Sequence, residues 1–173
     1  MSRAIADATV LIYLARLGEL RLLDELFDAV VVPTPVYEET LERGQDEGYL
    51  DAMRIEDATD PFLETHSIDG DAEDRATQVR KTANLGAGET AAIALAAEQD
   101  ARCLTDDHAA HRTAQSLDVT VGGTIYVLLR ALERDMLSFQ EFEHRLTALD
   151  DAGLHMGAGL YQRALEAGNE LAE

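Results

Sequence analysis

The sequence predicts an α/β fold in which helices flank a central, mostly parallel sheet. Short apolar runs at residues 3–6, 29–32 and 101–105 alternate along the chain with segments whose apolar residues recur at helical spacing. This alternation implies that the strands pair in parallel through right-handed crossovers. Ligands of such sheets bind outside the carboxyl ends of the strands, so the residues that follow each strand are the first candidates for a site.

The predicted strands are short and are bordered by acids, prolines or glycines. The first ends at Asp7, the second is stopped by Pro33, and the run that contains Cys103 ends in two aspartates. The predicted strands are 3–6, 29–32, 64–68 as an edge strand, 101–105 and 119–121.

Helical patterns fill the intervening segments. Gly18 divides the first pattern into two short helices, and Thr34 followed by Pro35 is a favourable helix start. A break is predicted at Pro61, and an Ala-rich helix begins after Gly86. The remaining predicted helices are 35 to about 44, a short one around 49–55, 72–83, 108–117, 124–132 capped by Thr124, 138–149 and 160–171.

Length and composition indicate one globular domain with an acidic surface. The chain has 173 residues, with 34 acids against 14 bases and a formal net charge of -20. Such acidity, with Lys81 as the only lysine, fits a salt-rich cytoplasm where screening removes self-repulsion. Unfolding in low salt, reversed by KCl, would test this adaptation. The charge argues against a broad basic nucleic-acid footprint, but not against a local one bridged by a metal.

Other sequence features bear on the cell compartment. A single cysteine, Cys103, excludes an intrachain disulfide or a cysteine-based zinc cluster, and its apolar surroundings indicate a small core residue. No signal peptide is recognised, and no stretch approaches the roughly 20 apolar residues of a membrane span. A cytoplasmic location is therefore expected.

Several acids are predicted to meet at the carboxyl edge of the sheet. Asp7 ends the first strand, and Asp106 and Asp107 end the strand at 101–105. Glu89 lies in the first turn of the Ala-rich helix, on the stripe that faces the core. Glu39 is the fourth candidate.

The choice of Glu39 over its neighbour Glu38 follows from helical geometry. The two point about 100° apart, and Glu39 lies three residues beyond the apolar Val36, so it borders the core face. The acids gathered in this way are predicted to converge within a few ångströms, with Glu38 pointing away.

A hard cation would relieve the repulsion between such acids, and Mg²⁺ or Mn²⁺ suits oxygen ligands. Each acid also has a local explanation. Asp7, the pair Asp106–Asp107 and Glu89 could each satisfy the N-terminus of a helix. The joint pattern is more specific than any one member.

Other candidates carry less weight. His108 and His111 have a spacing that fits a transition metal, but surface positions on a helix are the favoured interpretation. Thr9 and Thr105 flank acids and could hydrogen-bond to them, or have ordinary turn and strand roles. The glycines match no phosphate loop, and no Gly-x-Ser-x-Gly motif supports a serine hydrolase.

Two other α/β classes with clustered aspartates fit poorly. A response-receiver domain needs a lysine at the site, and Lys81 lies outside any strand end. A haloacid-type phosphatase needs an acid two residues after Asp7, where Thr9 stands.

These motifs resemble the PIN domain, the metal-dependent ribonuclease fold of VapC-type toxins, over almost the whole chain. The likeness is closest to a subgroup of predicted nucleic-acid-binding proteins, in which the run Gly-Glu-x-x-Ala-Ile is the most specific signature. The matching segments are Ile5–Ile12, Leu14–Gly18, Val32–Glu39, Leu85–Ala96, Leu104–Asp107, Gly123–Thr124 and Val127–Leu129. The match places the family acids on Glu39 and, at the last motif, on Asp107 in preference to Asp106.

The sequence departs from the subgroup at three positions, none of which removes an acid. His111, beside Arg112, stands where a basic residue is usual, and Asp118 and Tyr126 stand where the subgroup has glycines. These changes bear on how substrate phosphates are held.

The resemblance implies a three-layer PIN-like fold over residues 1–173, with C-terminal helices from about 138–173 packing on it. It implies a metal-dependent endoribonuclease that hydrolyses phosphodiesters with a metal-activated water, and a role as the toxin of a toxin–antitoxin pair. RNA is then the substrate, a small antitoxin the partner, and a homodimer the assembly. The alternative is a non-catalytic PIN-fold nucleic-acid-binding or scaffold protein.

Residue roles follow from this hypothesis. The catalytic candidates are Asp7, Glu39, Glu89 and Asp107, and the Mg²⁺ or Mn²⁺ ligands are Asp7, Glu89, Asp107 and Asp106. The substrate-binding candidates are Thr9, Thr105 and Arg112.

Overall fold

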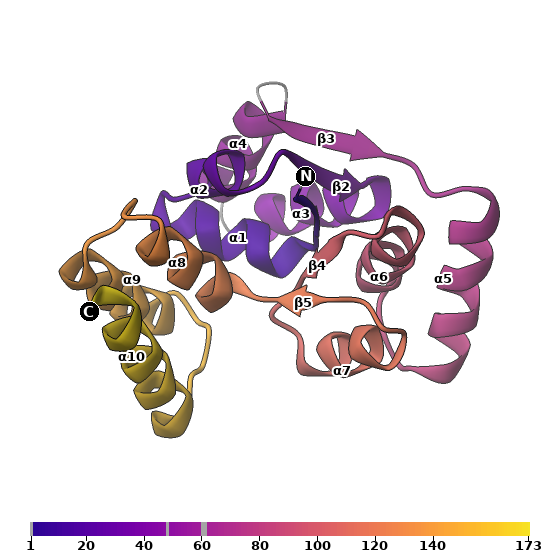
Figure 1. Ribbon diagram of the computed structural model, residues 1–173. Coiled ribbons are helices and arrows are strands. Elements are labelled where there is room, and N and C mark those ends of the chain that lie inside the picture. The colour runs from indigo at the N-terminus through magenta and orange to yellow at the C-terminus, as the bar shows by residue number, and fades with distance from the viewer. Residues whose placement is uncertain (1, 48, 60–61) are drawn as a thin grey trace.

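The computed structural model describes residues 2–47, 49–59 and 62–173, and the side chains of all of these except 43–50. The break predicted at Pro61 lies outside the described residues. Five parallel strands form one sheet in the order β3-β2-β1-β4-β5 (Figure 1). The strands are β1 (Arg3–Ala6), β2 (Ala29–Pro33), β3 (Leu63–His66), β4 (Arg102–Leu104) and β5 (Val121–Gly122).

Helices connect the strands and extend beyond the last one. In Figure 1, α8, α9 and α10 lie together at one end of the molecule and α5 lies at the other. The helices are α1 (Ala8–Leu17), α2 (Arg21–Leu26), α3 (Thr34–Glu47), α4 (Tyr49–Thr59), α5 (Gly70–Thr82), α6 (Ala87–Gln99), α7 (His108–Ser116), α8 (Thr124–Glu133), α9 (Phe139–Asp151) and α10 (Ala158–Ala172).

Most predicted boundaries fall within a few residues of the observed ones. Gly18 separates α1 from α2 as predicted, with φ of 70°, a left-handed conformation that glycine adopts without strain. The helix predicted to end near Gly44 instead continues to Glu47. The last strand begins at Val121 and not at Val119, because Val119 still donates its N–H to Ala114 and closes the turn after α7.

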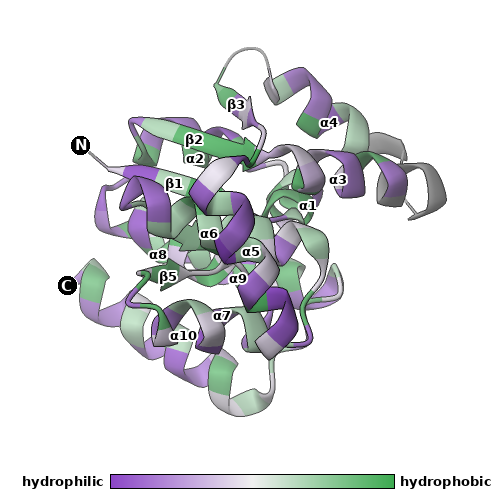
Figure 2. Cartoon of the chain, turned by 90° about the vertical axis from the view of Figure 1, so that its right-hand side faces the viewer, coloured by the Kyte–Doolittle hydropathy of each residue, from purple (hydrophilic) through white to green (hydrophobic). Residues whose placement is uncertain are grey.

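The sheet has a hydrophobic layer on each face, since alternate residues of a strand point to opposite sides. Figure 2 shows hydrophobic colouring along β2 and hydrophilic stretches on α4 and α5. One face packs against α1, α2, α8 and α9 through Ala4, Ala6, Val30, Val32 and Leu104. The opposite face packs against α6 and α7 through Ile5, Val31 and Cys103, so the cysteine is the buried core residue that the sequence predicted.

Helix α6 is enclosed on all sides, which corrects the interpretation of its sequence. Every residue from Thr90 to Ala96 is buried, against the sheet and helices α3, α5 and α7. The small alanine side chains allow this close packing, and the helix has no single core-facing stripe. The position of Glu89 on such a stripe therefore does not explain its orientation.

The strand order places a topological switch point between β1 and β4. The chain moves outward from β1 through β2 to β3 on one side, and from β4 to β5 on the other. Ligand sites of open parallel sheets lie at this point, outside the carboxyl ends of the strands. Residues 7 and 105–107 follow β1 and β4 directly and thus occupy this position. None of the described helices has the length and apolar character needed to span a lipid bilayer.

Candidate active site

Asp7 is the buried centre of the carboxyl edge, with 1% of its surface exposed. Its backbone N–H donates to the Leu104 carbonyl across 3.0 Å, which ties the end of β1 to the end of β4. Its carboxylate oxygen Oδ1 caps α1 by accepting from the Val10 N–H at 3.2 Å, and also accepts from the Thr9 hydroxyl at 2.7 Å. The side chain is therefore held in one orientation by local bonds.

The second oxygen of Asp7 has no hydrogen-bond partner of ordinary geometry among the described residues, although the Thr105 hydroxyl is near enough to the carboxylate to lower its pKa. Oδ2 is buried and makes no hydrogen bond to any described residue. Burial raises the pKa of Asp7 from 3.8 to about 7, and the charge of Asp106 adds to this, while the nearby hydroxyls of Thr105 and Thr9 and the Val10 N–H lower it. A buried carboxylate oxygen with no partner is unfavourable, so this atom indicates a site built to receive a cation or a proton.

Asp106 is joined to Asp7 through Thr9. The Thr9 hydroxyl that donates to Asp7 also accepts from the Asp106 N–H at 3.1 Å. The Asp106 carboxylate accepts twice from Thr124, through Oδ1 from its N–H at 2.8 Å and through Oδ2 from its hydroxyl at 2.6 Å. Burial raises the pKa of Asp106, opposed by these two bonds and by His111. Two desolvated carboxylates thus share one edge of the sheet.

Asp107 has a local role in this structure. Its Oδ1 accepts from the Ala110 N–H at 2.8 Å and caps α7, while its own N–H donates to the Thr105 hydroxyl at 3.2 Å. Asp106, and not Asp107, contributes to the raised pKa of Asp7. The charge of Asp106, although the smallest influence on the pKa of Asp7, thus marks it as an electrostatic neighbour of Asp7, whereas the resemblance to the PIN domain placed the family acid on Asp107.

Glu39 and Glu89 each lie near the start of α6, against different glycines. Glu89 turns back on its own helix, where Oε2 accepts from the Gly86 N–H at 2.8 Å. A Cβ atom on Gly88 would lie only 2.6 Å from Glu39 Oε2, so the absence of a side chain at residue 88 leaves room for that carboxylate. Glu38 is exposed. The expectation that Glu39 lies inward and Glu38 points away therefore agrees with the structure.

The predicted convergence of all the acids is not observed. Within residues 2–47, 49–59 and 62–173, no three His, Cys, Asp or Glu side chains are grouped closely enough to hold a metal ion. The physical reason lies in the bonds just described. Asp106, Asp107 and Glu89 are each drawn to a backbone N–H at a helix start, the local role that the sequence left open for them.

A cleft of about 410 Å³ opens beside Asp106 and contains further polar groups. Arg112, a predicted substrate-binding residue, lines it and is exposed. His108 and His111, interpreted as incidental surface residues, line it too. The lining residues are Thr105, Asp106, His108, His111, Arg112, Gly123, Ile125, Leu154, His155 and Leu160.

The roles of two residues in this region, Thr124 and His155, were not predicted from the sequence. Thr124 was interpreted as a helix cap, but Gly123 is the N-cap of α8 and the Thr124 hydroxyl binds Asp106. A hydroxyl residue directly after a Gly-Gly strand end was the signal that could have found it. His155 carries no such signal, because it reaches the cleft only through the packing of the segment between α9 and α10.

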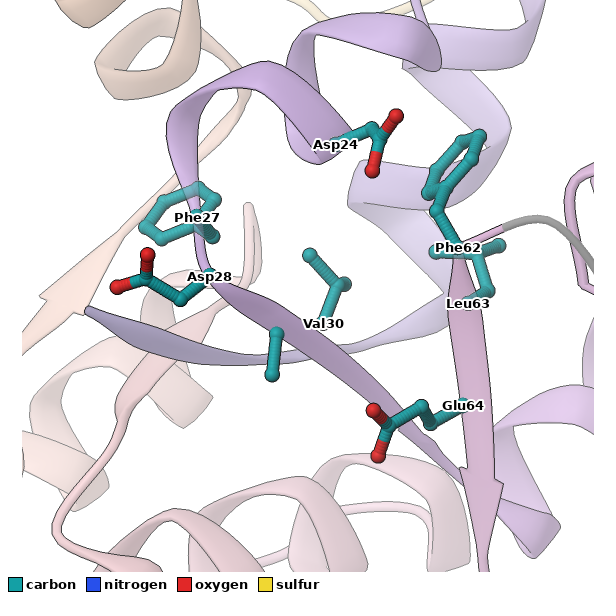
Figure 3. Close-up of a pocket in the computed structure, with 8 residues that line it drawn as sticks. Asp24, Phe27, Asp28, Val30, Phe62, Leu63 and Glu64 are labelled. Atoms are coloured by element: carbon teal, nitrogen blue, oxygen red, sulfur yellow. The ribbon is translucent and has the colours of Figure 1, made fainter. Parts of the chain in front are cut away.

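A separate pocket of about 310 Å³ lies at the opposite end of the strands (Figure 3). Asp24, Asp28 and Glu64 line it together with Phe27 and Phe62. Since Asp28 precedes β2 and Glu64 is near the start of β3, this pocket lies away from the carboxyl edge. It therefore supplies an acidic reference position for tests of the site at Asp7.

The parallel sheet and its helices make this an α/β protein. Its candidate site lies at the topological switch point, where two desolvated aspartates offer oxygen ligands. The chain belongs to the PIN-domain family, since the family model described as "DUF3368: PIN domain" matches residues 3–170. No curated protein matched the chain. A chain in the crystal structure of VapBC2 from Rickettsia felis, bound to a DNA fragment from their promoter, has the same fold. That match has a TM-score of 0.53 at 10% identity and covers 70% of this chain and 98% of the other.

Proposed function

We propose that this protein is a metal-dependent endoribonuclease, a hydrolase of phosphodiester bonds that uses Mg²⁺ or Mn²⁺. The observation that carries the proposal is the buried, unpartnered Oδ2 of Asp7 at the switch point, among the described residues. Membership of the PIN-domain family supports it. The adjacent cleft, with Arg112 and three histidines, supports a substrate that carries negative charge.

The residues present fit a hard divalent cation. Asp7 offers an oxygen that lacks a hydrogen-bond partner among the described residues, and Asp106 lies close enough to raise its pKa. These two would hold the ion, with Asp107, Glu89 and Glu39 as the surrounding acids. Bound Mg²⁺ or Mn²⁺ supplies positive charge for a phosphate and lowers the pKa of a water.

Residues of the chain itself orient Asp7 and Asp106 and shield one side of the site from water. Thr9 fixes the orientation of Asp7 and connects it to the backbone of Asp106. Thr124 fixes both oxygens of Asp106. Burial of Asp7 excludes water from one side of the site, which strengthens electrostatic interactions with a phosphate. Arg112 and the histidines lie where they can hold the substrate strand.

We also propose a role as the toxin of a toxin–antitoxin pair, with a small antitoxin as partner and a homodimer as the assembly. The VapBC2 structure, a complex bound to promoter DNA, supports this by its fold. Co-purification with the product of a short adjacent reading frame, and light scattering on the purified protein, test these two points. A monomer that captures no such product contradicts both.

The nuclease proposal is tested by incubating purified protein with single-stranded RNA and Mn²⁺ or Mg²⁺, with and without EDTA. Cleavage is expected only with the metal, and Asp7→Asn is expected to abolish it. Asp28→Asn is the matched control, because it removes the same charge in the pocket at the opposite end of the strands. Equal activity of Asp7→Asn and Asp28→Asn would overturn the assignment.

The alternative is a non-catalytic PIN-fold protein that binds nucleic acid or acts as a scaffold. One observation favours it, namely that no three acids are grouped within the described part of the chain. Calorimetric titration with Mn²⁺ separates the two functions. The nuclease binds the ion through Asp7 and loses this binding in Asp7→Asn, whereas a scaffold shows no Asp7-dependent heat.

A further inference from the structure

Four arginines line one pocket of about 280 Å³ at the start of the strands. Arg3 opens β1, Arg102 opens β4, and Arg130 and Arg134 lie at the end of α8. Segments far apart in the sequence thus bring positive charge to one place. This concentration stands out in a chain whose formal net charge is -20 and which has only 14 basic residues.

The arginines of the pocket are only partly neutralised. Arg130 pairs with Glu133, while Arg3 donates to the neutral Gln99 side chain at 3.1 Å. Arg102 donates to the Val121 carbonyl at 3.0 Å, and Arg134 forms no ion pair with any described residue. The sequence contains 34 acids that could have formed ion pairs with these arginines. Three guanidinium groups that have no carboxylate partner within the described part of the chain indicate a site for an external anion.

The pocket is built by packing as well as by charge. The guanidinium carbon of Arg102 lies 4.4 Å from the centroid of the Tyr126 ring, a cation–π contact that helps to hold it in place. The Tyr126 ring fits there because Gly122 has no side chain, since a Cβ atom at that position would lie 2.5 Å from the ring. Arg130 and Arg134 offset the dipole of the α8 C-terminus, but Arg3 and Arg102 come from strands and have no such role.

The pocket and the candidate active site lie at opposite ends of the same strand. Arg102 opens β4 and Asp106 follows four residues later, which corresponds to about 13 Å along an extended chain. Both faces of the sheet are covered by helices, so an RNA strand would have to pass over the surface and its path would be longer than this distance. Because the chain carries a formal net charge of -20, a cationic contact of this kind would help to hold the flanking part of an RNA bound at Asp106, in addition to Arg112 and the histidines of the cleft.

We propose that this arginine pocket binds backbone phosphates of the RNA strand, away from the bond that is cleaved. The proposal rests on the proposed function for the identity of the strand. Guanidinium groups form bidentate bonds with phosphate oxygens, and several of them around one cavity suit a tetrahedral anion better than a single side-chain carboxylate. Asp100 also lines the pocket, and its negative charge opposes an anion that lies close to it.

The decisive experiment measures binding of labelled single-stranded RNA by fluorescence anisotropy in EDTA, over a series of KCl concentrations. The test variant is Arg3→Gln with Arg134→Gln, which leaves the Arg130–Glu133 pair intact. The control is Arg75→Gln with Arg80→Gln, two exposed arginines of α5 that remove the same charge. All four side chains are exposed, so both variants are expected to fold, and circular dichroism confirms this.

The pocket variant is expected to weaken RNA binding at least 10-fold and to reduce the slope of log K against log salt by about 1.4, which is about 0.7 for each of the two phosphate contacts. The control pair is expected to change binding less than twofold. Equal weakening by both pairs would show an effect of net charge alone and overturn the proposal. Absence of RNA binding by the unaltered protein would overturn it as well.

Two further measurements distinguish RNA binding in the pocket from binding of an acidic protein and from an effect on the active site. Polyglutamate in place of RNA tests for an acidic protein partner, and pocket-dependent binding of polyglutamate without RNA binding contradicts the assignment. Cleavage of a dinucleotide with Mn²⁺ tests the active site alone and should be unchanged in the pocket variant. RNA binding is measured in EDTA and therefore does not depend on metal-dependent cleavage. The binding result can be interpreted even if the protein is not a nuclease.

Discussion

The Thr9 hydroxyl donates a hydrogen bond of 2.7 Å to Oδ1 of Asp7, and the other oxygen of that carboxylate remains buried without a partner among the described residues. The same hydroxyl accepts from the Asp106 N–H at 3.1 Å. One side chain therefore fixes the carboxylate at the end of β1 and connects it to the end of β4. The consequences can be tested residue by residue.

Thr9→Val removes this connection while keeping nearly the same side-chain shape. We expect RNA cleavage to fall about 10-fold to 100-fold, the usual effect of losing a residue that orients a metal ligand. The loss should appear in kcat more than in KM, measured under saturating Mn²⁺. Thr9→Ser retains the hydroxyl and should keep most of the activity. If Thr9→Val and Thr9→Ser behave alike, the hydrogen bond has no part in catalysis.

Asp7→Asn should stabilise the metal-free protein at high pH. The pKa of Asp7 is about 7 in the folded chain, against an ordinary value of 3.8. Between these values the folded state binds more protons than the unfolded state, so stability falls as the pH rises from about 4 to about 7. Asparagine keeps the oxygen that caps α1 but carries no charge.

This prediction is measured by urea unfolding in EDTA at pH 5 and pH 8. Since the pKa of Asp7 lies at about 7 against 3.8 and each pKa unit corresponds to about 1.4 kcal/mol, the variant should gain roughly 4 kcal/mol at pH 8 and clearly less at pH 5. The Asp28→Asn control should show no such difference. Equal or lower stability of Asp7→Asn at pH 8 would contradict the description of Asp7 as a buried, uncompensated carboxylate.

Gly88→Ala tests the position of Glu39. The added Cβ would lie 2.6 Å from Glu39 Oε2 and 3.3 Å from Val36 Cγ2, so α3 or the carboxylate has to move. We expect a loss of at most about 1 kcal/mol in the free energy of unfolding, because Glu39 Oε2 is the far end of a flexible side chain and alanine suits a helix better than glycine. Cleavage should fall as well, if Glu39 belongs to the site.

Gly86→Ala is the matched control for this change. A Cβ on Gly86 would lie 3.5 Å from Glu89 Oε2, an ordinary contact, and its φ of -72° suits alanine. This variant should therefore retain activity. Loss of activity in both variants would point to damage at the start of α6 in general.

Asp106→Asn and Asp107→Asn separate the two adjacent aspartates. Asp106 contributes to the raised pKa of Asp7, whereas Asp107 caps α7 through Ala110. We expect Asp106→Asn to reduce Mn²⁺ affinity at least 10-fold, and Asp107→Asn to reduce it less. Titration calorimetry gives both affinities. If Asp107→Asn reduces Mn²⁺ affinity more than Asp106→Asn does, the result would favour Asp107, the residue on which the resemblance to the PIN domain placed the family acid.

Much of the fold was predictable because its signals are local. Apolar runs, Gly18 and the aspartates at the strand ends depend on neighbouring residues, and the structure has strands and turns near each of them. The position of Asp7 at the carboxyl edge followed from the same logic. The all-parallel pairing followed from the alternation of strands and helices.

The remaining features depend on tertiary packing. Helix α6 is buried on every side, so its sequence pattern could not show which way Glu89 turns. The bond from Thr124 to Asp106 joins residues 18 positions apart, and the arginine pocket joins β1, β4 and α8. Sequence spacing carries no information about such contacts.

The most direct test of the central claim is an anomalous difference map from crystals of the protein grown with Mn²⁺. We expect a peak about 2.1 Å from Asp7 Oδ2, with Asp106 as the neighbouring acid. We also expect that Asp7→Asn crystals lack this peak. An unchanged peak in that variant, or a peak only at the histidines of the cleft, would contradict the account.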